Sequence, residues 1–382
     1  MSYRGITASV LISSVLVSCG VLASCTSSPG LPATAGGPGA VDSGGAGDGA
    51  ASGGASGGNV LGGPGGGGGV VVEQPDTAGG DASAGGAGGG ATMDAAPSDA
   101  GDATSAGGGK FKGRATKSAG CGKPNPPSGL DLTITVQGKT GHYILTLPAN
   151  YDPNTPYPLA FGFHGHGQTG QVCYGGASCS GYQSTLKNVA VVVYPTTLSP
   201  TGGWEAAGAN EREINVTYFS ALLAKVEDTY CINPTRVFVA GTSSGASFSN
   251  ILGCRFADVL LAVAPVDGIA PATMGETNCK GAVGALAIHG YKDSHVPFAQ
   301  GEKARDYFRS QDHCTSTATP PVAQIHAAVV ARPETHGCSM YEGCDPGVPV
   351  MWCEHSEGGY DGSTHGWPKF GGQAIWDFVK GL

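Results

Sequence analysis

The sequence is poor in charged and aromatic residues. Of its 382 residues only 13% are charged and 7% are aromatic, and Lys plus Arg number 20 against 29 Asp plus Glu. The formal net charge is −9, and neither a run of basic residues nor a basic amphipathic helix occurs. Because nucleic-acid binding depends on clustered positive charge, we expect no nucleic-acid partner. The acidic balance serves solubility and does not indicate a substrate.

The first 25 residues have the pattern of an export signal rather than of structure. Arg4 supplies the positive charge, a weakly apolar stretch follows, and the run 22–25 (LASC) resembles the lipobox of bacterial lipoproteins. Acylation is therefore expected at Cys25, although Cys19 ends a similar tetrapeptide. An ordinary signal peptide and a single anchoring helix are the alternatives. Each interpretation places the rest of the chain outside the cytoplasm. The lipobox favours a chain that is secreted or anchored to the cell envelope by lipid only.

Residues 26–118 lack the apolar side chains that a folded core requires. They consist largely of Gly, Ala, Ser, Pro and Asp, with almost no aromatic residue. Such a segment cannot bury enough apolar surface to offset the entropy lost on ordering. We predict a Gly/Ala/Ser-rich disordered linker that leads into a single domain over residues 119–382, which is long enough for a full core.

The cysteines favour disulfides over a metal site. Twelve cysteines less the two in the signal leave ten, an even number, in a chain expected to meet an oxidising compartment. No C-x-x-C pair or H-x-x-x-H cluster suggests zinc, so no metal is expected. Short loops predict the bridges Cys173–Cys179 and Cys338–Cys344, and the other pairings stay open.

Strands and helices alternate through the domain. An alternating pattern predicts a hairpin over 132–136 and 142–147. Apolar runs predict buried strands at 159–163, 190–194, 237–240, 260–266, 285–289 and 350–354. Helical spacing or composition predicts helices at 216–230, 298–311 and 373–380. This order implies parallel strands joined by right-handed crossovers, hence an α/β fold with a doubly wound, mostly parallel sheet.

Ser243 is the candidate nucleophile. It is the third residue of the pentapeptide 241–245 (GTSSG), which follows a strand and opens a helical stretch. A strand, a sharp turn flanked by glycines and a helix form the context in which a G-x-S-x-G pattern lifts a serine hydroxyl above the sheet edge. A chance match in a chain rich in Gly and Ser is the alternative, and both flanks argue against it.

A serine nucleophile needs a base and a carboxylate that orients the base. Asp293 follows the strand at 285–289, on the edge of the sheet where active sites of open sheets lie. Asp267 is the reserve candidate and Asp361 a weaker one. The base expected from the chain order of this arrangement is His365, between the last strand and the last helix.

Other histidines fit the role of base less well. His355 falls on or at the end of the last strand, and His295 follows Asp293 too closely.

The oxyanion formed during acyl transfer needs backbone N–H donors. Ser244, the residue after the nucleophile, supplies one. The glycine-rich loop that follows the strand at 159–163 supplies the other, assigned to His166 with Gly165 or Gly167 as alternatives. A metal site on His164 and His166 is the competing interpretation, but no carboxylate or cysteine joins them.

Together these motifs resemble the secreted feruloyl esterase and polyhydroxybutyrate-depolymerase-like branch of the α/β-hydrolases. The resemblance covers residues 120 to 382 and depends on five short motifs: 120–123 (GCGK), 163–165 (FHG), the serine pentapeptide, 288–297 (IHGYKDSHVP) and 365–368 (HGWP). It implies hydrolysis of carboxylic ester bonds without a cofactor. In place of the family's Asp-Val pair, the sequence has Asn215-Val216.

The resemblance implies a serine esterase acting on feruloyl or acetyl esters of plant polysaccharide. A polyester (polyhydroxyalkanoate) depolymerase, a non-catalytic polysaccharide-binding lipoprotein and a peptidase of the same fold are the alternatives. Trp204 and Trp367 are candidates for stacking on the substrate, with buried packing as the other role open to each.

Overall fold

The computed structural model describes residues 110–111, 113–124, 126–205, 209–277, 279–359 and 362–382. The expected signal, with Cys19 and Cys25, and residues 26–109 of the expected linker lie outside the described residues. The described end of that linker contacts the domain. Lys110 Nζ donates a hydrogen bond to the Leu260 carbonyl, and Ser118 Oγ donates one to the Tyr230 carbonyl. Contacts with the domain thus begin upstream of residue 119.

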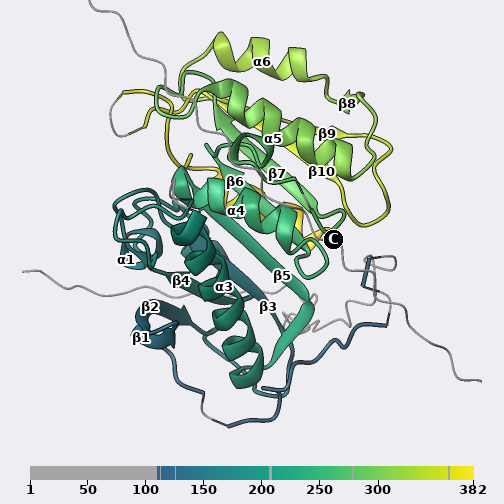
Figure 1. Cartoon of the computed structure of the whole chain (residues 1–382). Coiled ribbons are helices and arrows are strands. Elements are labelled where there is room, and N and C mark those ends of the chain that lie inside the picture. The colour runs from purple at the N-terminus through teal and green to yellow at the C-terminus, as the bar shows by residue number, and fades with distance from the viewer. Residues whose placement is uncertain (1–109, 112, 125, 206–208, 278, 360–361) are drawn as a thin grey trace, which may run out of the picture. The chain divides into compact units, whose positions relative to one another are not determined.

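The strands of the described residues form one ten-stranded sheet in the order β1-β2-β4-β3-β5-β6-β7-β10-β9-β8 (Figure 1). The central strands run parallel. They are β4 (Val191–Pro195), β3 (Tyr157–Phe163), β5 (Ile232–Thr242), β6 (Ala262–Val266), β7 (Gly284–Gly290) and β10 (Val350–His355). Antiparallel strands extend both edges. They are β1 (Gly129–Val136), β2 (Lys139–Thr146), β9 (His336–Tyr341) and β8 (Ala318–Thr319).

Helices cover both faces of the sheet. One face packs against α3 (Ala209–Thr229), α4 (Ser244–Arg255), α5 (Phe298–Gln311) and α6 (Val322–Val330). The other packs against α1 (Gly170–Tyr174), α2 (Tyr182–Leu186) and α7 (Gly371–Lys380). A short 3₁₀ helix, η1, spans Ala272–Met274. Successive side chains of β3 point to opposite faces of the sheet. Phe161 therefore packs into the core beneath α3 and α4, and Ala160 into the core beneath α2 and α7. The predicted doubly wound, mostly parallel α/β fold is confirmed.

The sequence predicted the buried elements better than the peripheral ones. The hairpin of β1 and β2, the central parallel strands and the helix at 298–311 are all present. Strands β8 and β9 and helices α1, α2 and α6 were not predicted. β9 has polar and small residues and is buried at only two positions, Ser339 and Tyr341, while α6 buries only Ile325 and Val329. Neither segment therefore has a strong apolar period.

Five disulfides connect the ten cysteines of the domain. They pair Cys121 with Cys231, Cys173 with Cys179, Cys254 with Cys279, Cys314 with Cys344, and Cys338 with Cys353. The predicted bridge Cys173–Cys179 is confirmed, and the predicted bridge Cys338–Cys344 is wrong. Cys338 of β9 lies directly opposite Cys353 of β10 in the antiparallel register, so strand pairing rather than loop length selects its partner.

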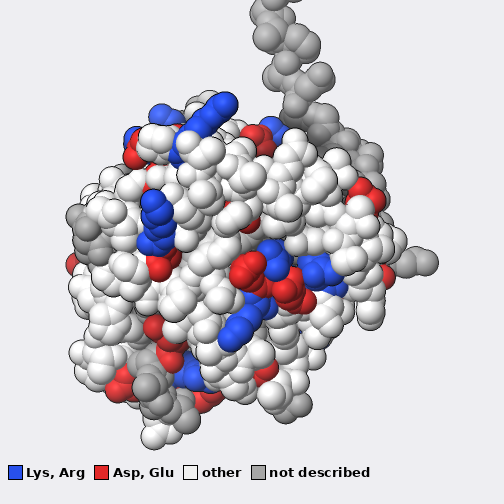
Figure 2. Space-filling model, turned by 90° about the horizontal axis from the view of Figure 1, so that it is seen from above, with Lys and Arg blue, Asp and Glu red and all other residues white. Residues whose placement is uncertain are grey.

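Charged side chains on the surface occur mostly in mixed groups. On the face shown in Figure 2, much of the surface is neutral, and acidic and basic side chains lie next to one another. Helix α5 carries one such group, in which Arg305 and Arg309 both contact Asp306 at 2.9 Å. Among the described residues, no helix combines the length and the apolar character that crossing a bilayer requires.

Candidate active site

Ser243 lies in a sharp turn between β5 and α4. Its backbone adopts φ 55° and ψ −117°, a conformation that residues other than glycine rarely adopt. Its N–H donates a hydrogen bond to the Val266 carbonyl at 2.9 Å. A Cβ added to Gly245 would lie 2.6 Å from the His164 carbonyl oxygen and still closer to that of Phe163. Only a glycine lets the first turn of α4 approach β3 this closely. The turn therefore has the backbone of a nucleophile elbow.

Asp293 and His365 come together from separate loops. Asp293 follows β7, His365 lies between β10 and α7, and His365 Nδ1 is 2.7 Å from Asp293 Oδ2. The side chains are 5% exposed for His365 and 0% for Asp293. The other carboxylate oxygen, Oδ1, accepts the N–H groups of His295 and Val296 at 2.8 and 2.9 Å. The carboxylate is thus held in place from both sides.

The two side chains shift each other's pKa in the directions that base catalysis needs. Burial alone would raise the pKa of Asp293, but hydrogen bonds from His289 and His365 hold that pKa well below its usual range. Burial alone would lower the pKa of His365, but the hydrogen bond with Asp293 outweighs it and raises that pKa. An ionised Asp293 therefore stabilises a proton on His365.

The loop after β3 limits the choice of the second oxyanion donor. Gly165 N–H donates to the Gln168 side chain at 3.0 Å, and Gly167 N–H donates to the Gly202 carbonyl at 3.0 Å. Both alternatives to His166 are thus engaged within the protein. Across the loop, the Ser244 hydroxyl accepts a hydrogen bond from Trp204 N–H at 2.8 Å and donates one to Glu205. The arrangement favours the backbone of His166 and Ser244 as the pair of donors.

Comparison with known proteins identifies the family. No family model matches the chain. Feruloyl esterase D of Neurospora crassa is 31% identical to it over 258 residues, which cover 63% of this chain and 81% of that protein. The chain belongs to the feruloyl esterase family. Feruloyl esterase C of Emericella nidulans is 29% identical over 266 residues, which cover 68% of this chain and 90% of that protein.

The fold agrees with this assignment. An acetyl xylan esterase from Aspergillus awamori superposes with a TM-score of 0.50 at 15% identity, over 66% of this chain and 100% of that one. The protein is thus a carboxylic ester hydrolase with an α/β-hydrolase fold, as the motifs implied.

The reserve candidates for acid and base have other places in this feruloyl esterase family member. Asp267 is fully buried and accepts the backbone N–H groups of Gly290 at 2.8 Å and Gly366 at 2.6 Å. Asp361 lies outside the described residues. His355 ends β10 and is only 1% exposed, and burial lowers its pKa. The ring of His295 lies 4.9 Å from that of His365.

His164 does not have the environment of a metal ligand. The esterase buries this side chain completely, and both ring nitrogens have protein partners. Nδ1 donates to the Gly165 carbonyl at 2.7 Å, and Nε2 accepts the Thr197 N–H at 3.2 Å. Burial lowers its pKa to about 4, so the neutral ring serves as a structural link between two loops.

Trp204 is not a stacking surface for substrate. Only 1% of it is exposed, its ring stacks on Phe248 and meets Phe163 edge-on, and its Nε1 donates to the His164 carbonyl at 3.0 Å. Of the two roles that the sequence left open for this side chain, buried packing is the one that the structure shows. Trp367 is half-buried and packs edge-on against Tyr182 at 5.5 Å.

Asn215 explains one departure of the esterase from its family's pattern. Its Oδ1 accepts hydrogen bonds from Leu198 N–H and the Thr197 hydroxyl at 3.0 and 3.1 Å, while its Nδ2 donates to the Trp204 carbonyl at 3.1 Å. The family's Asp could accept but not donate when ionised. The amide thus joins the start of the loop after β4 to the later part of the same loop, which carries Trp204 and Glu205. Neither Glu205 nor Asn215 was predicted as part of the site; the substitution at 215 was the only signal.

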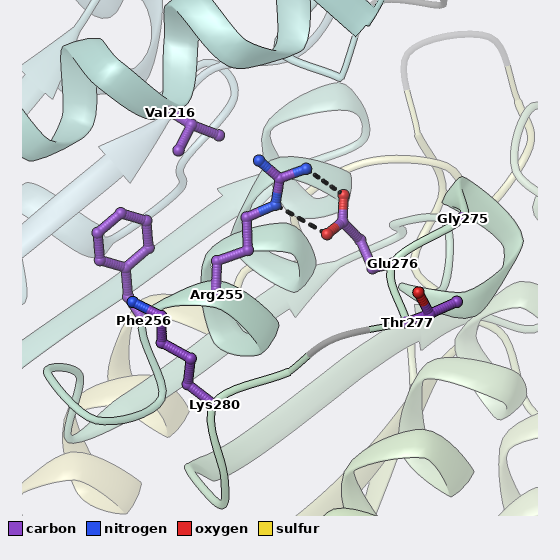
Figure 3. A pocket seen from close by; sticks show the side chains of 7 residues that line it. All are labelled: Val216, Arg255, Phe256, Gly275, Glu276, Thr277 and Lys280. Carbon is purple, nitrogen blue, oxygen red and sulfur yellow. Dashed lines mark hydrogen bonds and ion pairs between the residues drawn. The ribbon is translucent and has the colours of Figure 1, made fainter. Parts of the chain in front are cut away.

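A surface pocket lies away from the elbow of Ser243. It is lined by Val216, Arg255, Phe256, Gly275, Glu276, Thr277 and Lys280 (Figure 3). Arg255, the last residue of α4, forms a two-pronged ion pair with Glu276, with both hydrogen bonds at 2.8 Å. Since Ser243 precedes the first turn of α4, the pocket lies at the other end of a 12-residue helix from the elbow.

Proposed function

We propose that the protein is an extracytoplasmic serine esterase that hydrolyses feruloyl or acetyl esters of plant polysaccharide through an acyl-enzyme on Ser243. The observation that carries this proposal is the 2.7 Å contact between His365 and Asp293, on the loops after β10 and β7, in a chain whose elbow after β5 presents Ser243. These are the strand ends at which a triad assembles in this fold.

In the proposed reaction, His365 acts as base and then as acid in each of the two half-reactions. Ser243 Oγ attacks the ester carbonyl carbon while His365 Nε2 takes its proton. The imidazolium, held by Asp293 at Nδ1, then protonates the departing alkoxide, and the acyl group stays on the serine. Water, activated by the same imidazole, releases the carboxylic acid and restores the hydroxyl.

The negative charge that develops on the carbonyl oxygen needs donors in place beforehand. The N–H groups of Ser244 and His166 are proposed for this role, each worth about 3–4 kcal/mol of barrier lowering. The Ser244 side chain supports the role of its backbone, because its contacts with Trp204 and Glu205 hold the start of α4 against the facing loop.

The substrate class is proposed from the relatives. Two of them are named feruloyl esterases D and C. A further relative, 25% identical over 61% of this chain and 32% of its own length, is a bifunctional acetylxylan esterase/xylanase from Neocallimastix patriciarum. A small acyl or a phenolic acyl group on a plant polysaccharide is therefore the proposed ester.

An ester panel tests this proposal. Purified protein would be assayed on methyl ferulate, acetyl-xylan, p-nitrophenyl acetate and polyhydroxybutyrate. We expect turnover of the first three, a loss of several orders of magnitude in Ser243→Ala, and unchanged rates in Ser184→Ala, an exposed serine on α2. Polyester turnover alone would indicate a depolymerase. Polysaccharide binding without labelling by a fluorophosphonate probe would indicate a non-catalytic binding protein.

The cellular location is proposed as the cell envelope or the exterior. Five disulfides in the domain support an oxidising compartment. Acylation of Cys25 remains a prediction of the sequence. It would be tested by metabolic labelling with an alkyne fatty acid in a bacterial host. Label lost in Cys25→Ala and kept in Cys19→Ala supports the anchor at Cys25, and the reverse assigns it to Cys19.

A further inference from the structure

Behind the proposed triad lies a buried cluster that the proposed reaction does not use. It consists of Asp267, His289 and His355, which lie at the carboxyl ends of β6, β7 and β10, neighbours in the sheet. Their exposed fractions are 0%, 0% and 1%. A buried ionisable side chain lowers the free energy of unfolding unless it is paired. Because such side chains cluster at functional sites, we expect these three to contribute to the site beside them.

Nε2 of His289 faces two hydrogen-bond acceptors. His289 Nε2 lies 2.9 Å from the Val296 carbonyl oxygen and 3.4 Å from Asp293 Oδ2. Both neighbours are acceptors, so Nε2 carries a proton. One carboxylate oxygen, Asp293 Oδ2, is therefore shared by two imidazoles, that of His365 at 2.7 Å and that of His289 at 3.4 Å.

Nδ1, the other nitrogen of the His289 ring, faces Asp267. Nδ1 of His289 lies 3.9 Å from Asp267 Oδ1, and among the described residues it has no hydrogen-bond partner. A proton there would face a carboxylate, which places an imidazolium between Asp267 and Asp293. Burial alone would lower the pKa of His289, but the hydrogen bond to Asp293 and the charge of Asp267 outweigh it and raise that pKa.

His355 does not compete for this proton. Its Nε2 is 4.0 Å from Asp267 Oδ1, which, like the 3.9 Å from His289 Nδ1, is too long for a hydrogen bond. Unlike His289, however, neither of its ring nitrogens has a hydrogen-bond partner among the described residues. Burial lowers its pKa in spite of the charges of Asp267 and Glu357. Of the two histidines, His289 is therefore the one whose surroundings favour a positive charge.

Asp267 also holds the two loops that carry the acid and the base. Its Oδ1 accepts the N–H of Gly290, three residues before Asp293, and its Oδ2 accepts the N–H of Gly366, next to His365. One buried carboxylate therefore fixes the separation of the two backbones and also provides the counter-charge to His289.

We propose that His289 and Asp267 form a second His–Asp couple that positions Asp293 and sets the protonation of His365. The two are positioning residues, since neither is placed in contact with the reacting ester. The proposal depends on the proposed esterase function and extends it. The charged and titratable groups that face the His365 ring are Asp293, Asp267, His289 and His295, and those that face His289 are Asp267, Asp293 and His355.

The couple predicts pH shifts of opposite sign. A cation on His289 disfavours a proton on His365, whereas the anion of Asp267 favours it. The acidic limb of the pH profile of kcat/KM reports the protonation of the base, His365. In His289→Gln, whose amide keeps a donor for the Val296 carbonyl, this limb should move to higher pH. In Asp267→Asn it should move to lower pH. Each shift should be about one pH unit, as for charges a few ångströms away. His355→Gln, which removes a neutral ring, should leave the limb where it is.

The experiment is a pH profile of kcat/KM for the wild type and these variants on one ester of the panel, with folding checked by urea unfolding. Limbs that do not move, or that move in the same direction in His289→Gln and Asp267→Asn, would overturn the proposal. If His289 and Asp267 had a structural role only, the two variants would have a lower kcat/KM, but their acidic limbs would not move apart. A wild type without esterase activity would instead refute the proposed function, so the two failures are distinguishable.

A second measurement does not depend on the variants folding. In an NMR titration of the wild-type chain labelled at histidine, one imidazole other than His365 should keep both ring nitrogens protonated to a higher pH than a free histidine does. His365 is recognised by its loss in His365→Ala. If every imidazole other than His365 loses its proton at or below the pH at which free histidine does, His289 carries no stabilised cation.

Discussion

Gly245→Ala should damage both the stability and the activity of the enzyme. The added Cβ would lie 2.6 Å from the His164 carbonyl oxygen, whereas ordinary contact begins at 3.4 Å, and it would be closer still to the Phe163 carbonyl. Both obstacles are backbone atoms of β3 and of the loop after it, so neither can rotate away. Relieving the contact with His164 alone moves the first turn of α4 from β3 by about 0.8 Å, the difference between those two distances, and the closer Phe163 carbonyl requires more.

The expected magnitude follows from that displacement. Inserting a methyl group into a closely packed site costs about 1–3 kcal/mol of the free energy of unfolding. The same movement separates the Ser244 N–H from the loop of His166. Because a misplacement of about 1 Å can cost 10²-fold in rate, kcat should fall by about that factor.

Urea unfolding and the hydrolysis of p-nitrophenyl acetate would measure the two effects. The matched control is Gly129→Ala on the edge strand β1, where nothing lies within 4 Å of an added Cβ. It should change the free energy of unfolding by less than about 0.5 kcal/mol. Gly245→Ala with the stability and the rate of the control would refute the inference that the elbow requires this close approach.

Two further predictions concern stability. Replacing Cys338 and Cys353 together by Ala removes a bridge of sequence separation 15 and should lower the free energy of unfolding by about 3 kcal/mol in urea; stability equal to that in the wild type would contradict it. Burial raises the pKa of Asp312 from 3.8 to about 8, so the folded state is penalised as pH rises from 4 to 8. Asp312→Asn, which keeps the acceptor for Val283 N–H, should therefore be more stable than the wild type at pH 8 and similar to it at pH 4. A variant less stable at pH 8 would show this sign to be wrong.

Local sequence patterns predicted those features of the molecule that depend on residues close together in the chain. The pentapeptide around Ser243 specified an elbow because its glycines and flanking strand and helix are contiguous in the chain. The bridge Cys173–Cys179 spans 6 residues, so a short loop sufficed to predict it. Asp293 and His365 were chosen for their positions after strands, and the structure places them 2.7 Å apart.

Features that depend on which strands are neighbours were not predictable in this way. Cys338 pairs with Cys353 because β9 joins the edge of the sheet beside β10, and the segment of β9 had no strand pattern. Trp204 is buried because Phe163 and Phe248, far from it in the sequence, close around its ring.

The sequence by itself determined the chemistry available to this protein: a serine on a tight turn, a carboxylate and a histidine after later strands, and cysteines for an oxidising compartment. Only the tertiary structure decided how these groups are held. Asp267, His289 and His355 are separated by 22 and 66 residues, and they meet because the parallel strands β6, β7 and β10 end side by side. Side chains at the same edge of a sheet share their electrostatics whatever their distance along the chain, because burial there leaves little water to screen one charge from the next.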